Sequence, residues 1–189
     1  MEFTNTNDVL RAELQKVIDK ARSNLAVTKS WVQNDGSTRR KKIDTTGRLW
    51  KSLQIGEIKE DKGVFSVEIF MEDYGKFIDQ GVSGTRNKTP KPSPFSFRSD
   101  GVSRNMQTNI QAWMNKKRIR LRDAATGRFR KGSLSQRKGL SYVISRSIKR
   151  KGINQTFFFT KPLEVGLETL PALMADAIMK DIEKTFNKD

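Results

Sequence analysis

Residues 46–71 read TGRLWKSLQIGEIKEDKGVFSVEIFM, and this stretch decides the fold class. One or two helical turns run into a strand, and the charged turn at residues 60–63 separates that strand from a second one. Phe65, Val67 and Ile69 share one face of the second strand, because successive side chains point to opposite faces. The stretch therefore predicts an antiparallel β-hairpin.

Amphipathic helices are predicted on both sides of this hairpin. In residues 7–28 and 170–186, apolar residues recur with the period of a helix that has one buried face. The N-terminal stripe consists of Leu10, Leu14, Val17, Ile18, Ala21 and Leu25. The C-terminal stripe consists of Leu170, Leu173, Met174, Ala177, Ile178, Ile182 and Phe186. The predicted fold is α+β, with an antiparallel β-hairpin-based sheet packed against N- and C-terminal helices.

Three shorter segments complete the prediction for the ends of the chain. Residues 29–43 are polar and are predicted to form a loop, with a turn at Asp35-Gly36. Residues 74–81 predict a short helix that Gly81 closes. Residues 156–160 contain three consecutive phenylalanines and predict a short apolar strand that Pro162 stops.

The positive charge of the chain is concentrated in one internal segment. The 189 residues carry 37 Lys and Arg against 21 Asp and Glu, a net charge of +16, whereas residues 80–153 alone carry 19 against 2. We expect a single domain over 1–189, with a core formed by 1–81 and 140–189 and a basic insertion at 82–139. Such a segment favours binding to phosphate or to an acidic protein surface, and a solvated loop that keeps the protein soluble is the alternative.

Within this segment, residues 117–131 predict a basic β-hairpin arm between helices at 104–116 and 135–151, the second of which has Leu140, Val143, Ile144 and Ile148 as its apolar stripe. Arginines alternate with apolar residues before a turn at 124–127 and resume after it, so Arg118, Arg120 and Arg122 are predicted to share one face of a strand. An isolated two-stranded ribbon is marginal in water, and like charges on paired strands repel, so we expect an acidic partner to order the arm. Candidate partner- or phosphate-binding residues are Lys116, Lys117, Arg118, Arg120, Arg122, Arg128, Arg130 and Lys131. Candidate interface anchors are Trp31 and Phe129, for which packing against the body is the alternative.

Several classes of chemistry are excluded by composition. The chain has no Cys and no His, which rules out disulfides, thiol catalysis, Cys/His zinc sites and His-dependent triads. No apolar run approaches the roughly 20 residues of a membrane span, and the N-terminus lacks the pattern of a signal peptide. We expect a soluble protein made in a cytosol, with no catalytic residue, metal or cofactor and no membrane partner.

One acidic cluster keeps a catalytic alternative open. Glu68, Glu72, Asp73 and Asp79 follow one another closely, and carboxylates are ligands for divalent cations of the kind that nucleases use. The alternative is a solvated strand end and helix start. Magnesium-dependent cleavage that is lost on Asp79→Asn would support the nuclease hypothesis.

The order of three elements resembles a known family. The first is TGRLWKSL at 46–53, the second is YGKFIDQG at 74–81, and the third is TFFFTKP at 156–162. With a helix at each end and a variable insertion, they resemble the tail-completion or neck proteins of tailed bacteriophages, found in the head–tail connectors of lambdoid siphophages. The resemblance covers roughly 1–81 and 140–189.

The resemblance implies a non-enzymatic structural role in the virion, with assembly in the host cytoplasm. Members of the family form a ring, six-fold or twelve-fold, between the portal or its adaptors and the tail proteins. The basic arm is then expected to contact acidic neighbours or the genomic DNA. We favour neighbours, because a strongly basic channel wall would retard the leaving genome. The alternative function is a DNA-binding protein that uses residues 80–153 without sequence readout.

Overall fold

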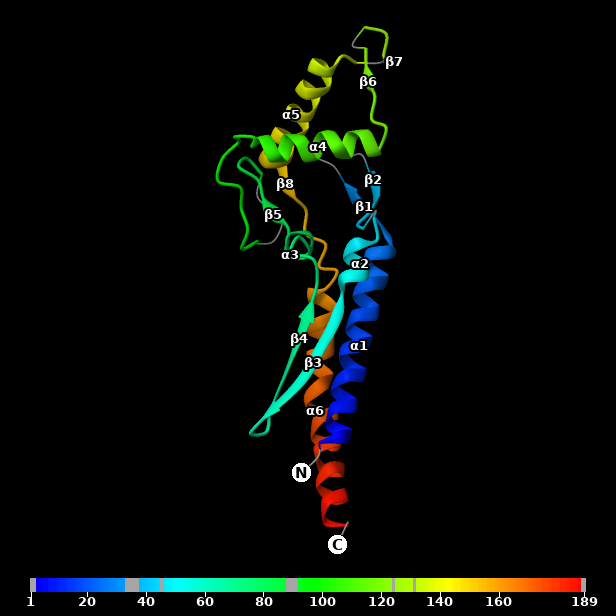
Figure 1. Cartoon of the computed structure of the whole chain (residues 1–189), viewed down its shortest axis with the longest axis vertical. Helices are drawn as coiled ribbons and strands as arrows, with labels where there is room; N and C mark the ends of the chain where they lie inside the picture. The colour runs from blue at the N-terminus through cyan, green and yellow to red at the C-terminus, as the bar shows by residue number, and fades with distance from the viewer. Residues whose placement is uncertain are drawn as a thin grey trace. The chain divides into compact units, whose positions relative to one another are not determined.

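The fold is described from a computed structural model (Figure 1), which covers residues 3–32, 38–44, 46–87, 92–123, 125–130 and 132–187. For residues 28–32 and 38–42 it gives the backbone alone. The chain divides into two compact units. Unit 1 comprises Met1–Asp79 and Thr156–Asp189, and unit 2 is Gln80–Gln155. Unit 2 therefore begins before the expected insertion at 82–139 and ends after it.

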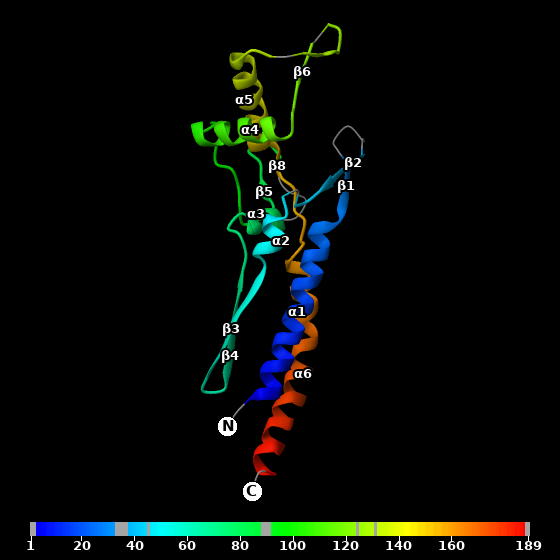
Figure 2. The same cartoon turned by 45° about the vertical axis from the view of Figure 1, so that its right-hand side comes forward.

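Two long antiparallel helices form the length of unit 1. These are α1 (Thr4–Ala26) and α6 (Thr160–Phe186), which lie side by side in both views (Figures 1 and 2). The hairpin of β3 (Gln54–Asp61) and β4 (Val64–Phe70) runs along this pair, with β3 against α1. Two short helices, α2 (Arg48–Ser52) and α3 (Gly75–Gln80), flank the hairpin. The α+β prediction is confirmed.

The apolar stripe predicted for the N-terminal helix is the buried face of α1. All six residues of the predicted stripe are buried, and three of them join Leu49, Leu53 and Phe158 in the core cluster. Phe158 comes from the segment that precedes α6. The core therefore joins residues of the N-terminal elements to a residue of the C-terminal segment. Each large apolar side chain of this cluster contributes about 1.5–3 kcal/mol when it is removed from water.

The β-hairpin also forms as predicted. The two strands pair antiparallel from Gln54↔Phe70 to Asp61↔Val64, with one irregularity between Ile55 and Ile58. Phe65, Val67 and Ile69 lie on the half-buried face. Near the turn, the ring of Phe65 meets that of Phe3 edge-on, with centroids 5.4 Å apart, which fixes the hairpin against the start of α1.

The polar loop predicted for residues 29–43 is wrong. The chain forms a second hairpin there, in which β1 (Thr28–Val32) pairs antiparallel with β2 (Thr38–Lys42). The basic run at 39–42 suggested a loop, yet backbone hydrogen bonds in a ladder do not require apolar side chains. The predicted turn at Asp35-Gly36 and the side chain of Trp31 lie outside the described residues.

The short strand predicted for residues 156–160 is also wrong. Phe158 and Phe159 form a turn, and α6 begins at Thr160, ten residues before the predicted start of the C-terminal helix. Pro162 lies in the first turn of α6. The first N–H groups of a helix have no partner within the helix, so a proline is tolerated there.

Unit 2 contains two crossing helices, α4 (Arg104–Lys116) and α5 (Leu134–Lys151) (Figure 1). Its ends are joined by the short pair of β5 (Val82–Ser83) and β8 (Gly152–Ile153). In α5 the predicted stripe is wrong at Val143, which is 61% exposed, whereas Ser141 and Ser145 are buried. The side chain of Gln111 on α4 donates to the Ser141 hydroxyl over 3.2 Å, so polar side chains take part in the contact between these helices. No helix in the described ranges has the length and apolar character needed to cross a membrane.

The start of α1 is capped from α6 by the buried carboxylate of Asp181. Its two oxygens accept hydrogen bonds from the backbone N–H of Asn5 at 3.0 Å and from that of Thr6 at 2.9 Å. The Thr6 hydroxyl donates a further bond of 2.7 Å. Burial alone would raise the pKa of Asp181, but these hydrogen bonds together lower it below the ordinary 3.8.

We predict that Asp181→Asn lowers the stability of the protein at pH 7 by about 2 kcal/mol, since hydrogen bonds to a charged group are lost. As the pH falls below 3.8, the unfolded wild type binds its proton before the folded protein does. The advantage of the wild type is therefore present above that pH and shrinks below it, by at most about 1.4 kcal/mol per pH unit. Urea unfolding between pH 7 and pH 2 measures it. Asp176→Asn, on the exposed side of the same helix, is the control. It should change neither the stability at pH 7 nor the dependence of stability on pH.

Candidate partner-binding site

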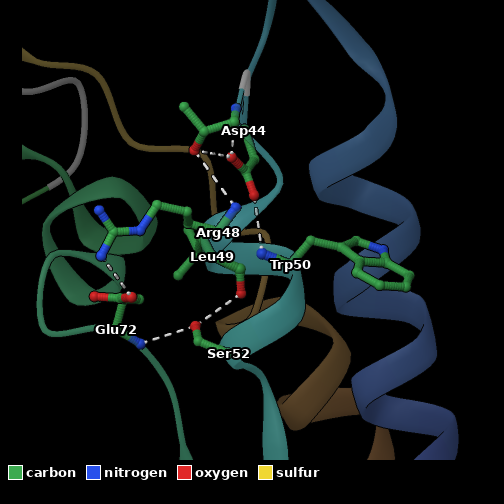
Figure 3. A network of polar contacts seen from close by, with 7 residues as sticks. Asp44, Arg48, Leu49, Trp50, Ser52 and Glu72 are labelled. Carbon is green, nitrogen blue, oxygen red and sulfur yellow. Dashed lines mark hydrogen bonds and ion pairs between the residues drawn. The ribbon is translucent and has the colours of Figure 1, made fainter.

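The first motif, at residues 46–53, forms a capped helical turn (Figure 3). The buried Asp44 accepts hydrogen bonds from the backbone N–H of Gly47 at 2.8 Å and of Trp50 at 2.9 Å. Burial tends to raise the pKa of Asp44, but the N–H donors of Trp50, Gly47 and Thr46, with the Thr46 hydroxyl, lower it overall. Sequence reasoning missed Asp44, which lies three residues before the N-cap Gly47 and therefore outside the position at which a capping side chain is normally sought.

The same turn is tied to the end of the hairpin. The Ser52 hydroxyl donates to the Leu49 carbonyl over 2.9 Å and accepts from the backbone N–H of Glu72 over 3.0 Å. Arg48 lies 3.3 Å from the Glu72 carboxylate (Figure 3). Leu49 and Leu53 are fully buried. The observed contacts of this motif therefore stabilise the fold.

The second and third motifs meet at Asp79. Its buried carboxylate accepts from the backbone N–H of Phe159 at 2.8 Å and of Thr160 at 3.3 Å, and from the Thr160 hydroxyl. These donors are the unpaired groups at the start of α6, so Asp79 caps that helix from α3. Its backbone carbonyl also accepts from the N–H of Thr156 and of Phe157, at 3.1 and 3.0 Å.

Unit 2 is therefore inserted between two adjacent points of unit 1. The chain leaves unit 1 after Asp79 and returns at Thr156, which is hydrogen-bonded to it. Inside unit 2, Val82 pairs with Ile153 and Ser83 with Gly152. The entering and leaving strands are thus paired directly after the junction, and the excess positive charge of the chain lies in the segment between them.

The acidic residues of the nuclease hypothesis do not converge. Asp79 caps α6, Glu72 pairs with Arg48, and Asp73 and Glu68 are exposed. Within the described ranges, no group of three or more acidic residues is placed to hold a metal ion. The observed role of Asp79 is therefore structural.

The arm forms a hairpin that is shorter than expected. β6 (Leu121–Arg122) pairs with β7 (Phe129–Arg130), and the Asp123 carboxylate accepts from the backbone N–H of Ala125 and of Thr126 in the turn. These bonds lower the pKa of Asp123, with those from Thr126 as the largest cause. Arg122 lies opposite Phe129, with its guanidinium 4.6 Å from the ring centroid. The arrangement places a cation over an aromatic face.

The basic residues predicted for the arm are exposed, but they do not share one strand. Lys116 ends α4, and Lys117, Arg118 and Arg120 precede the strand, so the shared strand face predicted for Arg118, Arg120 and Arg122 is wrong. The first four are exposed, as are Arg122, Arg128 and Arg130. Phe129 is 59% exposed. Lys131 lies outside the described residues.

In the described part of the arm no cation forms an ion pair with a carboxylate, and Asp123 in the turn interacts electrostatically with Arg130. Among the described residues of unit 2, the ion pair between Arg150 and Asp100, at 2.6 Å, is the only one. An excess of exposed cations over carboxylates raises the local positive potential. This potential is compatible with the predicted binding of phosphate groups or protein carboxylates, which stays a prediction.

A second candidate is an open groove between α1 and the edge of β3, which sequence reasoning missed. Arg22 crosses one end: it donates to the Leu53 carbonyl over 2.7 Å, and its guanidinium lies 4.9 Å from the Trp50 ring centroid. Its Nε atom is buried with no hydrogen-bond partner in the described part of the chain. The residues come from two elements far apart in sequence, so no local motif indicates them. They are Asp8, Arg11, Ala12, Gln15, Ile18, Arg22, Leu53, Gln54 and Ile55.

The geometry thus offers a basic arm with an exposed aromatic residue, and a groove beside β3 that is lined by both polar and apolar residues. Comparison of the chain with protein-family models, with curated proteins and with solved structures finds no match in any of the three.

Proposed function

We propose that this chain is a structural virion protein of a tailed phage. In this proposal it forms an oligomeric ring in the head–tail connector, which joins portal-side proteins to the tail, and it has no catalytic role. The observation that carries the proposal is the division of charge. Unit 1 has 18 Lys and Arg against 19 Asp and Glu, whereas unit 2 has 19 against 2.

The position of the motifs gives further support. The three motifs of the resemblance lie in unit 1, apart from the last two residues of the second, and they meet around one core. The stretch between the second and third motifs is unit 2. A closed scaffold that carries a basic appendage suits a ring subunit that must grip an acidic neighbour.

The alternative is a protein that binds DNA without reading its sequence. The exposed arginines of the arm favour this function, because Arg and Lys supply most contacts to phosphate. Under this alternative the monomer binds duplex DNA with submicromolar affinity that falls steeply with salt. Under the connector proposal the monomer binds DNA weakly and assembles with protein partners.

Fractionation of virus particles tests the proposal directly. Particles from the producing culture are separated on a density gradient, and the DNA-filled band is quantified by mass spectrometry. Recovery of roughly six or twelve copies per particle supports a connector ring, whose closed symmetry sets such numbers. Absence from particles, with recovery in free nucleoprotein, contradicts the proposal and favours DNA binding.

We predict that replacing the five described arm arginines with glutamine lowers recovery in particles about tenfold or more, with little change in the stability of the folded protein. The residues are exposed, and exposed substitutions usually shift stability by less than about 0.5 kcal/mol. The residues are Arg118, Arg120, Arg122, Arg128 and Arg130.

The control removes the same charge from unit 1, at exposed lysines, and should leave particle recovery unchanged. Its residues are Lys20, Lys51, Lys59, Lys62 and Lys76. If DNA is the partner instead, the plot of log affinity against log salt concentration will become less steep for the arm variant alone. Its slope should fall in magnitude by up to about 4–5, roughly 0.9 for each phosphate contact removed.

A further inference from the structure

A second apolar stripe on α6 is left uncovered by the fold. The inner face of this helix carries the Asp181 that caps α1. On the outer side, Val165, Met179 and Phe186 are 62%, 61% and 76% exposed. Together with Ala172, these residues follow one another at intervals of seven, and Ala175 and Ile182 fill the positions between them. This spacing forms a seam of the kind that a second helix covers.

The same side of α6 is acidic. Four carboxylates project from this half of the helix, and only Lys161, near its start, offsets them. None of the four is in an ion pair within the described part of the chain. They are Glu164, Glu168, Asp176 and Glu183. A matching partner is therefore helical, partly apolar and basic on the contacting side.

The outer side of α5 has this character. Tyr142 and Val143 are 43% and 61% exposed, although the rest of the predicted stripe is half-buried. Lys138 lies one turn before Tyr142, and Arg146 lies one turn after it, on the same side. The whole of α5, Leu134–Lys151, contains no acidic residue.

We propose that the outer face of α6 in one copy of the chain binds the outer face of α5 in a second copy. This rests on the proposed function, for which it names the contact between neighbouring ring subunits. A symmetric contact between two α6 helices would bring Glu168 and Asp176 of one copy against those of the other. Such like-charge contacts are unfavourable, and the same holds for two α5 helices, so charge selects the mixed pair.

This pairing makes the assembly directional. The two contacting faces differ and both are present on every copy, so each subunit uses one face for the preceding neighbour and the other face for the next. Head-to-tail contacts of this type close into a ring when the rotation allows it.

The absence of cysteine in the chain makes a direct test straightforward. Met179→Cys and Val143→Cys are purified separately, mixed under oxidising conditions and analysed by non-reducing electrophoresis. Both positions are exposed, so folding is preserved. Ala172→Cys with Ser135→Cys gives a second pair in case the helices meet in another register. Lys180→Cys, beside Met179 but on a different side of α6, is the matched control.

We expect at least one mixed pair to form about tenfold more disulfide-linked dimer than the pair of Lys180→Cys with Val143→Cys, a preference of about 1.4 kcal/mol. Asp176→Arg should reduce this crosslinking, and Arg146→Asp on the partner copy should restore it. Equal crosslinking in all mixtures overturns the inference. Stronger crosslinking of Met179→Cys with itself also overturns it, in favour of a symmetric α6 contact.

The failure of this inference and that of the proposed function are distinguishable. Particle recovery is measured on the unaltered protein and does not depend on which faces meet. A protein found in particles whose cysteine pairs do not crosslink retains the proposed function and loses this contact. A protein absent from particles whose pairs crosslink retains the contact and loses the proposed function.

Discussion

Asp79→Ala will lower the stability of the protein by about 3–4 kcal/mol, which is a large share of the roughly 5–15 kcal/mol typical of a folded domain. The carboxylate accepts two backbone N–H groups and one hydroxyl at the start of α6. Removing it leaves buried donors unpaired, and each costs about 1–3 kcal/mol. Urea unfolding followed by circular dichroism measures the change.

Asp73→Ala is the matched control, because Asp73 is an exposed carboxylate six residues away in the same acidic cluster. It should change stability by less than about 0.5 kcal/mol. Asp79→Asn separates the structural role from the nuclease hypothesis. A variant that keeps its fold in mild conditions but loses magnesium-dependent cleavage would contradict the structural role.

Gly152→Ala will unfold unit 2 in preference to unit 1. Gly152 has φ +79° and ψ −169°, a region that is essentially restricted to glycine. A Cβ atom there would lie 2.3 Å from the Val82 carbonyl oxygen and 2.6 Å from the Gly84 nitrogen, and backbone cannot yield as a flexible side chain can. Strain and overpacking together cost about 3–4 kcal/mol.

Amide hydrogen exchange followed by mass spectrometry resolves this effect by segment. Peptides from α4 and α5 should lose protection, whereas peptides from α1 and the β3–β4 hairpin should keep it. Gly139→Ala is the control, since a Cβ on this helical glycine meets no atom within 4 Å and should stabilise α5 by about 0.5–1 kcal/mol. Equal loss of protection in both units would show that they do not unfold separately.

The elements predicted well from sequence are those whose apolar residues, as the sequence spaces them, are also the residues that pack against the core. α1 buries every residue of its stripe, and the β3–β4 hairpin keeps its predicted face, because one side of each meets a core. The outer part of the C-terminal stripe failed for a physical reason. Periodicity indicates which side chains are apolar, and α6 has apolar residues on two sides, of which the fold covers one. Ile182 and Phe186 therefore remain exposed.

The candidate site was only partly predictable. Composition located the basic segment, and alternation located a hairpin within it. Its ladder has only two residue pairs, because the residues before Leu121 continue the end of α4, where Arg118 has a positive φ and the Ile119 N–H donates to the Met114 carbonyl. The groove beside β3 and the caps supplied by Asp79 and Asp181 join residues that are distant in sequence. A single sequence carries no signal for such pairs until the chain is folded.

Asp79 and Thr156, which are hydrogen-bonded to each other, mark a position at which the segment between them can be exchanged for another. These bonds hold the two ends of the inserted segment together. The segment can therefore be lengthened, shortened or replaced at a small entropic cost, about 0.6 kcal/mol for each doubling of a flexible loop. A scaffold of this type can acquire a new binding specificity through a change in the inserted segment alone. The same junction would accept an unrelated binding module, grafted between residues 79 and 156, without redesign of the helices that carry it.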